Sequence, residues 1–147
     1  MGLVEELKGL KVCIDTAPFI YFIEKQRKYL DILKLIFTKI NDGDINGLTS
    51  TITLLEVLVH PLKSGNEPLA KKYREVLLYS ENLITFGVTN EVSEKAANLR
   101  AKYLLKTPDA IQIATGILYG AEKFLTNDPV LRKVTEIQVL VLDDFVI

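Results

Sequence analysis

The sequence predicts an α/β protein with a central, mainly parallel sheet of about five strands and helices on both faces. Short apolar runs alternate with longer segments of helical periodicity, which is the pattern of repeated strand–helix–strand units. Hydrophobic residues make up 48% of the 147 residues, and the mean hydropathy is +0.20. Strands buried on both faces of a parallel sheet produce such a composition. No linker or repeat interrupts the pattern, so we expect a single domain over residues 1–147.

Each predicted strand is a short apolar run bounded by turn or capping residues. In chain order the strands occupy residues 11–15, 45–50, 83–86, 123–126 and 138–142. The helices between them are expected over residues 18–23, 29–40, 51–59, 69–79, 90–103 and 107–120, with a short helical turn over residues 129–133. Helical spacing is clearest for Leu33, Ile36 and Ile40, and the turn residues 41–44 end that helix.

Helix boundaries follow from capping residues and proline. Thr51 or Thr53 is predicted to begin the third helix, and Pro61 to end it, because proline disfavours helical backbone in the residue before it. Residues 63–68 are then expected to form a loop.

The two later helices also carry start signals. Thr89 or Asn90 is predicted to cap one helix. Thr107 is predicted to cap the next, with Pro108 at its first position.

Composition and charge exclude several classes of protein. A net charge of −1 gives no general attraction to nucleic acid, so such binding would need a local basic patch. Cys13 is the only cysteine and lies in an apolar run, so we expect it to be a small buried side chain. A single cysteine cannot form an internal disulfide, which suits a reducing cytoplasm. The N-terminus lacks the pattern of a signal peptide, and no apolar run is long enough to span a bilayer.

Four acidic residues occupy positions where a charge is unexpected. Asp15 ends the first apolar strand, Glu56 interrupts a run of aliphatic residues, Asp109 opens an apolar helix, and Asp128 follows the fourth strand. A carboxylate in apolar surroundings is costly unless it is paired, hydrogen-bonded or bound to a metal. Ligands of open parallel sheets bind beyond the carboxyl ends of the strands, so these acids are expected to converge there.

Each acid also has an ordinary explanation. Asp15 and Asp128 each stand where a helix cap is wanted, and Asp109 lies in a first helical turn, where a negative charge is favourable. Glu56 could extend its carboxylate to the surface. Taken together, the four favour a site for a hard cation, because Mg²⁺ and Mn²⁺ prefer oxygen ligands. A cation would let a phosphodiester approach the acids and would activate water.

The segments around these acids resemble the PIN-domain ribonucleases, most closely the VapC-like toxins of toxin–antitoxin pairs. The matching segments are residues 13–21, 50–57, 106–114 and 124–128, which occur in the family's order and span nearly the whole chain. The Thr-Pro-Asp-Ala-Ile sequence at residues 107–111 is the most specific of them. The resemblance implies a three-layer α/β/α PIN-like fold and an endoribonuclease that depends on Mg²⁺ or Mn²⁺.

The resemblance also assigns roles to residues. Asp15 and Asp109 would be the principal metal ligands, while Glu56 and Asp128 would hold metal-bound waters or a second ion. Two hydroxyl residues, Thr16 and Thr126, would support the site by hydrogen bonding.

The chain departs from the family at two positions. Ala17 replaces a residue that is often polar, and Pro129 follows Asp128 where an aromatic-containing turn is common. The second departure makes Asp128 the least secure of the four acids.

The expected partners are RNA, a cognate antitoxin and, by resemblance, a second copy of the chain. Arg100, Lys102 and Lys106 precede Asp109 closely enough to contact RNA, although most charged runs are simply solvated. His60 is the only histidine, which leaves no pair of histidines for acid–base cleavage.

Two other functions remain open at this point. A haloacid-dehalogenase-type phosphohydrolase also carries an aspartate after its first strand, but it needs a second one where Ala17 stands. A non-catalytic PIN module that binds RNA or a protein partner would be expected to have lost some of the acids, and here all four are present.

Overall fold

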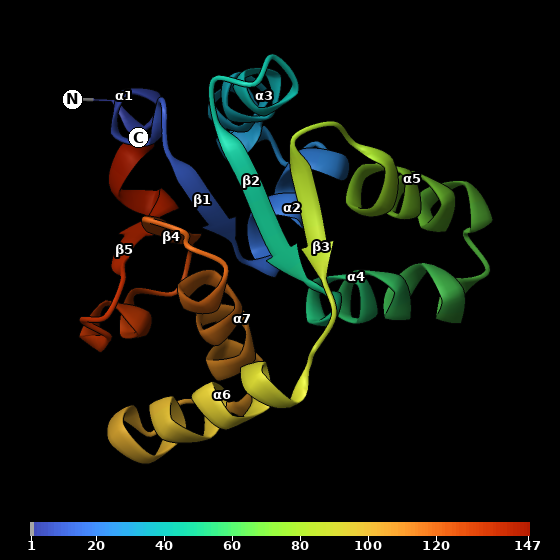
Figure 1. Cartoon of the computed structure of the whole chain (residues 1–147). Helices are drawn as coiled ribbons and strands as arrows, with labels where there is room; N and C mark the ends of the chain where they lie inside the picture. The colour runs from blue at the N-terminus through green and yellow to red at the C-terminus, as the bar shows by residue number, and fades with distance from the viewer. Residues whose placement is uncertain (1) are drawn as a thin grey trace.

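The computed structural model describes residues 2–147 and contains a parallel sheet of five strands in the order β3-β2-β1-β4-β5 (Figure 1). The strands are β1 (Lys11–Ile14), β2 (Asn46–Ser50), β3 (Leu83–Phe86), β4 (Lys123–Thr126) and β5 (Gln138–Val141). All five predicted strands are therefore present, each within about a residue of its expected bounds. No helix among the described residues is long and apolar enough to cross a membrane.

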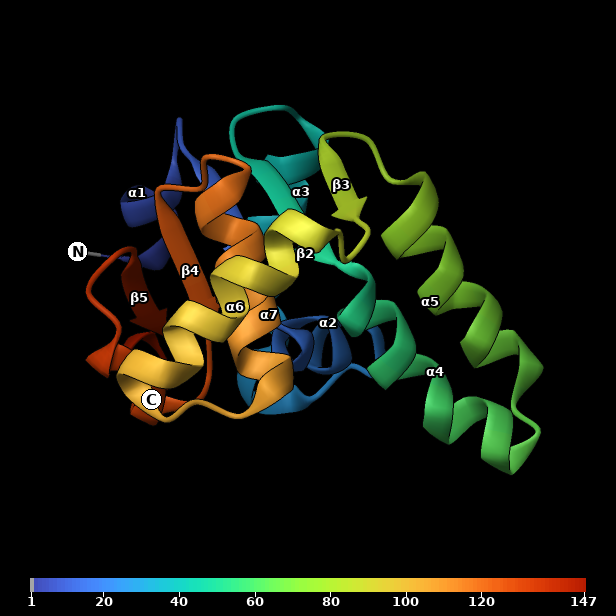
Figure 2. The same cartoon turned by 60° about the horizontal axis from the view of Figure 1, so that its bottom comes forward.

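Helices cover both faces of the sheet and make three layers (Figures 1 and 2). They are α1 (Leu3–Leu7), α2 (Thr16–Ile23), α3 (Arg27–Asn41), α4 (Thr51–Ser64), α5 (Glu67–Tyr79), α6 (Asn90–Tyr103) and α7 (Thr107–Leu118), with 3-10 turns η1 (Pro129–Lys133) and η2 (Leu142–Phe145). Figure 2 shows α4 and α5 side by side, extending away from the sheet. The three-layer α/β/α fold expected from the resemblance is confirmed.

The alternation of side chains along β1 divides the core in two. Val12 and Ile14 point into a cluster with α1, α2, α3 and α5, whereas Cys13 points into a second cluster with α6 and α7. Successive residues of a strand face opposite sides of the sheet, so a wholly apolar strand feeds both layers. Phe124 and Leu125 of β4 divide in the same way.

The path of the chain reverses beside β1. The segment from β1 through β2 to β3 builds the sheet outward in one direction, and the chain then returns through α6 and α7 to place β4 on the other side of β1. This reversal is the topological switch point at which ligands of such sheets bind. Asp15 follows β1 directly and Asp128 lies two residues beyond β4, so both stand at this point.

The predicted end of the third helix was wrong. Helix α4 continues through Pro61, which is buried inside it, and stops only at Gly65, whose φ of 71° closes the helix in the left-handed region. Proline removes one backbone hydrogen bond from a helix, but glycine supplies the conformation that ends one. The expected loop at residues 63–68 is consequently short, and α5 begins at Glu67 with the Asn66 side chain accepting a hydrogen bond from the Leu69 amide at 3.2 Å.

Helix starts also differ from expectation at two places. The Ser50 hydroxyl caps α4 instead of Thr51 or Thr53, accepting a hydrogen bond from the Ile52 amide at 3.1 Å. Lys106 precedes α7 without a side-chain cap, so Thr107 lies in the first turn. Thr89 caps α6 as predicted.

Helix α7 passes very close to β1, and this approach depends on Gly116. A Cβ atom at Gly116 would lie 2.9 Å from the Cβ of Cys13. Cys13 is fully buried, and its thiol donates a long hydrogen bond of 3.5 Å to the Gln112 carbonyl. The contact between two small residues fixes the height of α7 over the sheet, and α7 carries Asp109 to the carboxyl edge.

We predict that Gly116→Ala lowers the free energy of unfolding by about 1–3 kcal/mol, because the added methyl group overpacks the contact with Cys13. Urea unfolding of the parent and the variant measures this change. Gly87→Ala is the matched control, since a Cβ at Gly87 meets no atom within 4 Å. Equal stability of Gly116→Ala and the parent would contradict a close approach of α7 to β1.

Candidate active site

Asp15 lies at the centre of the polar groups that meet at the carboxyl edge of the sheet. Its Oδ1 accepts a hydrogen bond from the Thr16 amide at 2.9 Å, which caps α2. Its Oδ2 accepts one from the Thr126 hydroxyl at 2.7 Å. Burial raises the pKa of Asp15 above its usual range, and the nearby charge of Glu56 adds to the rise, while the hydrogen bonds oppose it. Asp15 is thus both the predicted cap and a member of an acidic cluster.

Glu56 reaches the same cluster from α4. Glu56 is exposed, which agrees with the alternative that its carboxylate extends to the surface. Its Oε1 accepts a hydrogen bond from the Thr16 hydroxyl at 2.6 Å. Because Thr16 follows Asp15 directly, the hydroxyl links the acid of α4 to the acid of β1. The Thr16 hydroxyl is therefore a hydrogen bonder at this edge of the sheet, and its supporting role in catalysis stays a prediction.

Asp109 stands in the first turn of α7 and faces the other three acids. Its pKa is raised to about 6, first by desolvation and then by the charges of Asp15, Asp128 and Glu56, with Lys106 opposing the rise. The charges of the other three acids thus act on Asp109. No three of these side chains within residues 2–147 are grouped closely enough to hold a metal ion.

Asp128 serves two purposes. Its Oδ1 accepts a hydrogen bond from the Val130 amide at 3.0 Å, so it caps η1 as the ordinary explanation predicts. Its own amide donates to the Thr126 hydroxyl at 3.1 Å, and that hydroxyl in turn donates to Asp15. Thr126 is completely buried and joins the ends of β1 and β4.

Gln112 is the residue that the sequence analysis missed. It is 1% exposed, and its Nε2 donates to the Thr53 hydroxyl at 2.6 Å and lies 3.2 Å from that of Thr16 and 3.4 Å from Asp15 Oδ1. Its Oε1 accepts from the Ser50 hydroxyl at 2.6 Å. The available signal was its spacing: Gln112 lies three residues after Asp109, which places both on one helix face. The amide ties α7 to the strand ends.

The three basic residues predicted near the site have different surroundings. Arg100 donates from Nε to the Leu105 carbonyl at 2.9 Å, and Lys102 lies 3.4 Å from Glu136. Both side chains thus hold the end of α6 and its neighbouring loop. The charge of Lys106 lowers the pKa of Asp109. Of the three basic residues, Lys106 is therefore the one whose charge acts on the acids.

The donor set suits a hard cation without forming a closed cage. No group of three or more His, Cys, Asp or Glu side chains within residues 2–147 is placed to hold a metal ion. The four converging acids offer only oxygen atoms, and Mg²⁺ is usually bound by one or two carboxylates together with waters and substrate phosphates. An ion bound by these acids would therefore have to keep much of its hydration shell.

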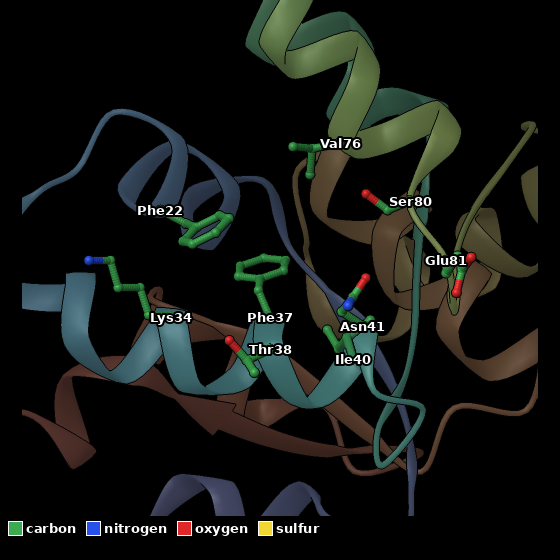
Figure 3. Close-up of a pocket in the computed structure, with 9 residues that line it drawn as sticks. All are labelled: Phe22, Lys34, Phe37, Thr38, Ile40, Asn41, Val76, Ser80 and Glu81. Atoms are coloured by element: carbon green, nitrogen blue, oxygen red, sulfur yellow. The ribbon is translucent and has the colours of Figure 1, made fainter.

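A cavity of about 400 Å³ lies elsewhere, between α3 and α5 (Figure 3). Its lining includes the stacked rings of Phe22 and Phe37 and the side chain of Val76. None of the four acids lines it, so it is separate from the chemistry discussed above.

Comparison with known proteins identifies the family. The PIN domain family matches residues 12–137, which is most of the chain, and the protein therefore belongs to the PIN domain family. A comparison with curated proteins gives no match.

Solved structures share the fold. A toxin–antitoxin complex from Klebsiella pneumoniae gives a TM-score of 0.68 at 22% identity, covering 90% of this chain and 97% of that one. VapBC2 from Rickettsia felis, bound to a promoter DNA fragment, gives 0.69 at 16% identity, covering 90% and 98%. VapC20 from Mycobacterium tuberculosis, described as a toxin that cleaves the sarcin-ricin loop, gives 0.67 at 14% identity, covering 86% and 98%. At these identities the likeness shows the fold.

We predict that Asp109→Asn stabilises the metal-free protein at neutral pH and loses this advantage in acid. The folded pKa of about 6 exceeds the ordinary value of 3.8, so the parent loses stability as pH rises between these values. A fully buried group with this shift would contribute about 3 kcal/mol. Asp109 is half-buried, so screening by water should leave a gain on the order of 1 kcal/mol above pH 6.

Urea unfolding in EDTA from pH 3.5 to pH 8 measures the effect. Glu91→Gln removes an exposed first-turn acid from α6 and controls for the lost interaction with the helix dipole, about 0.3–1 kcal/mol. The same difference between Asp109→Asn and the parent at every pH would contradict a strained acidic cluster.

Proposed function

We propose that the chain is a single-domain, metal-dependent endoribonuclease that hydrolyses RNA phosphodiesters at the Asp15–Glu56–Asp109–Asp128 site. The observation that supports this proposal is the raised pKa of Asp109, which is caused first by desolvation and then by the charges of Asp15, Asp128 and Glu56. The same acids sit at the switch point of the sheet, where such folds bind ligands. Membership of the PIN domain family favours this function over a haloacid-dehalogenase-type phosphohydrolase.

We assign each acid a role from its burial and its hydrogen bonds. A Mg²⁺ or Mn²⁺ ion, when bound, activates water and stabilises the leaving oxygen of the phosphodiester. Asp15 and Asp109 would be the principal ligands, because burial raises the pKa of both carboxyl groups. Thr126 orients Asp15 by its 2.7 Å hydrogen bond and so fixes the direction in which the remaining lone pairs point.

Glu56 and Asp128 complete the site from either side. Thr16 occupies Oε1 of Glu56, which leaves Oε2 able to accept a proton or hydrogen bond from the attacking water. Asp128 is held in place because its amide and carboxylate both make local hydrogen bonds. The only histidine, His60, lies within α4 on an exposed part of the helix, so a mechanism that uses two histidines is not available.

The biological setting that we propose is a toxin–antitoxin pair in the cytoplasm. Solved structures of the same fold include toxin–antitoxin complexes and a toxin described as cleaving the sarcin-ricin loop. An antitoxin partner, an RNA substrate and a homodimeric assembly are therefore proposed for this chain. A short neighbouring reading frame for a DNA-binding antitoxin would support the pairing.

We predict that the purified protein cleaves single-stranded RNA in Mg²⁺ or Mn²⁺ and stops in EDTA. The products should carry 5′-phosphate and 3′-hydroxyl ends, because water attacks in place of the ribose 2′-hydroxyl. End-labelled RNA, resolved on a denaturing gel with and without phosphatase treatment, identifies the ends. Cyclic phosphate ends would contradict this mechanism.

Asp109→Asn should lose at least a hundredfold in cleavage rate while keeping the parent's circular dichroism spectrum. Glu91→Gln is the matched control and should cleave at the parent rate, since it is an exposed first-turn acid on another helix. Full activity of Asp109→Asn would mean that Asp109 only places a favourable charge at the start of α7. Absence of both metal binding and cleavage in the parent would instead favour a non-catalytic PIN module.

A further inference from the structure

A small cavity of about 170 Å³ adjoins the acidic site between the end of α6 and η1. Asp109 and Asp128 line one side of it, so the cavity opens onto the proposed reaction centre. Leu105 and Leu131, which are almost fully buried, give it an apolar lining. Pockets for drug-sized ligands measure about 300–1,000 Å³, so this smaller one suits a single ring.

Leu104 forms an exposed wall of this cavity in a conformation that leucine disfavours. The residue caps α6 with a φ of 58° and a ψ of 40°, in the left-handed region that glycine or asparagine ordinarily occupies. Its side chain is 88% exposed, so burial does not compensate for the strained backbone. Val130, also exposed, lines the same cavity. A strained, exposed aliphatic residue at a cavity indicates a contact with something outside the folded chain.

Two lysines line the same cavity. Neither Lys106 nor Lys133 lies within 4.0 Å of a carboxylate in the described part of the chain. Most other cations near this end of the molecule are engaged: Lys102 pairs with Glu136 and Arg132 with Asp144. The lysines stand beside acids that would repel an RNA backbone, and they are available for phosphate groups.

Hydrogen bonds from α6 hold the cavity wall in place. Arg100 donates from Nε to the Leu105 carbonyl at 2.9 Å, and the Tyr103 hydroxyl bonds to Thr135 at 3.1 Å. These contacts fasten the α6–α7 loop to the segment after η1. The site therefore needs little reorganisation to receive a ligand.

We infer that this cavity is a nucleotide subsite of the RNA path, resting on the proposed ribonuclease function. The phosphate next to the scissile one ion-pairs with Lys106 and Lys133, and the base of that nucleotide packs against Leu104 and Val130. The subsite sets the register of the strand, so that the adjoining phosphodiester lies over the acids. Lys133, Leu104 and Val130 thereby become residues that position the substrate.

The salt dependence of RNA binding tests the subsite without requiring cleavage. Binding of a short fluorescent single-stranded RNA is measured by anisotropy at fixed Mg²⁺ and several salt concentrations, in an Asp15→Asn background, with a gel to show that the RNA stays intact. Each lost phosphate contact should reduce the slope of log K against log salt by about 0.7. We expect that reduction for Lys133→Gln and about 1.4 for the Lys106→Gln, Lys133→Gln double variant. Lys8→Gln, an exposed lysine just before β1 at the opposite edge of the sheet, should keep the parent slope.

Leu104→Gly provides a second readout that a structural role would not produce. Glycine accepts the left-handed conformation, so the variant should melt at or above the temperature of the parent. It should nevertheless bind RNA several-fold more weakly, with an unchanged salt slope, because the lost contact is apolar. A variant that is more stable and binds RNA less tightly separates substrate positioning from folding.

The outcomes distinguish the subsite from the proposed function. If the parent cleaves RNA while the lysine variants keep the parent slope and Leu104→Gly keeps the parent affinity, the subsite is overturned and the nuclease stands. If the slopes fall as expected but the parent never cleaves, the subsite stands and the catalytic proposal fails. If the protein binds no RNA, both are overturned.

Discussion

Repulsion between Asp109 and three other carboxylates is the constraint on which the proposed site depends. Asp109 carries its clearest signature, a pKa raised to about 6 by burial and by the charges of the other three acids. Such a cluster opposes folding unless other contacts hold it together. The fold supplies them by ending β1 and β4 side by side and by laying α7 across both, with Gly116 close to Cys13.

A hydroxyl and amide network lies beneath the acids and makes their arrangement specific. Thr126 bonds to Asp15, Thr16 bonds to Glu56, and Gln112 bonds to Thr53 and Ser50. No buried side-chain nitrogen or oxygen atom among the described residues lacks a hydrogen-bond partner. A fully satisfied buried network favours one arrangement over its alternatives, since any shift would leave polar groups unpaired. In the proposed site, a bound cation would offset the repulsion that raises the pKa of Asp109.

The sequence predicted those features of the fold that follow from local patterns of apolar and capping residues. Alternating apolar strands and helices predicted the parallel sheet, and the strand ends predicted that Asp15 and Asp128 would stand at its switch point. It was less informative where tertiary contacts decide: Pro61 did not end α4, because Gly65 provides the stop. The short helix α1 and the turn η2 carried too little periodicity to be anticipated. Gln112 was overlooked because a single polar residue in an apolar helix has no local meaning until Ser50 and Thr53 are placed opposite it.

The most direct test of the four-carboxylate site is a thermal melt with and without Mn²⁺. A cation that binds only the folded protein raises its melting temperature by mass action. Asp15→Asn removes one charge with almost no change of shape, so it should melt at or above the parent in EDTA and gain less from Mn²⁺. Asp31→Asn, an exposed acid on α3, should gain as much as the parent. Equal stabilisation of Asp15→Asn and the parent by Mn²⁺ would mean that Asp15 is not a principal ligand, and would contradict the proposed site.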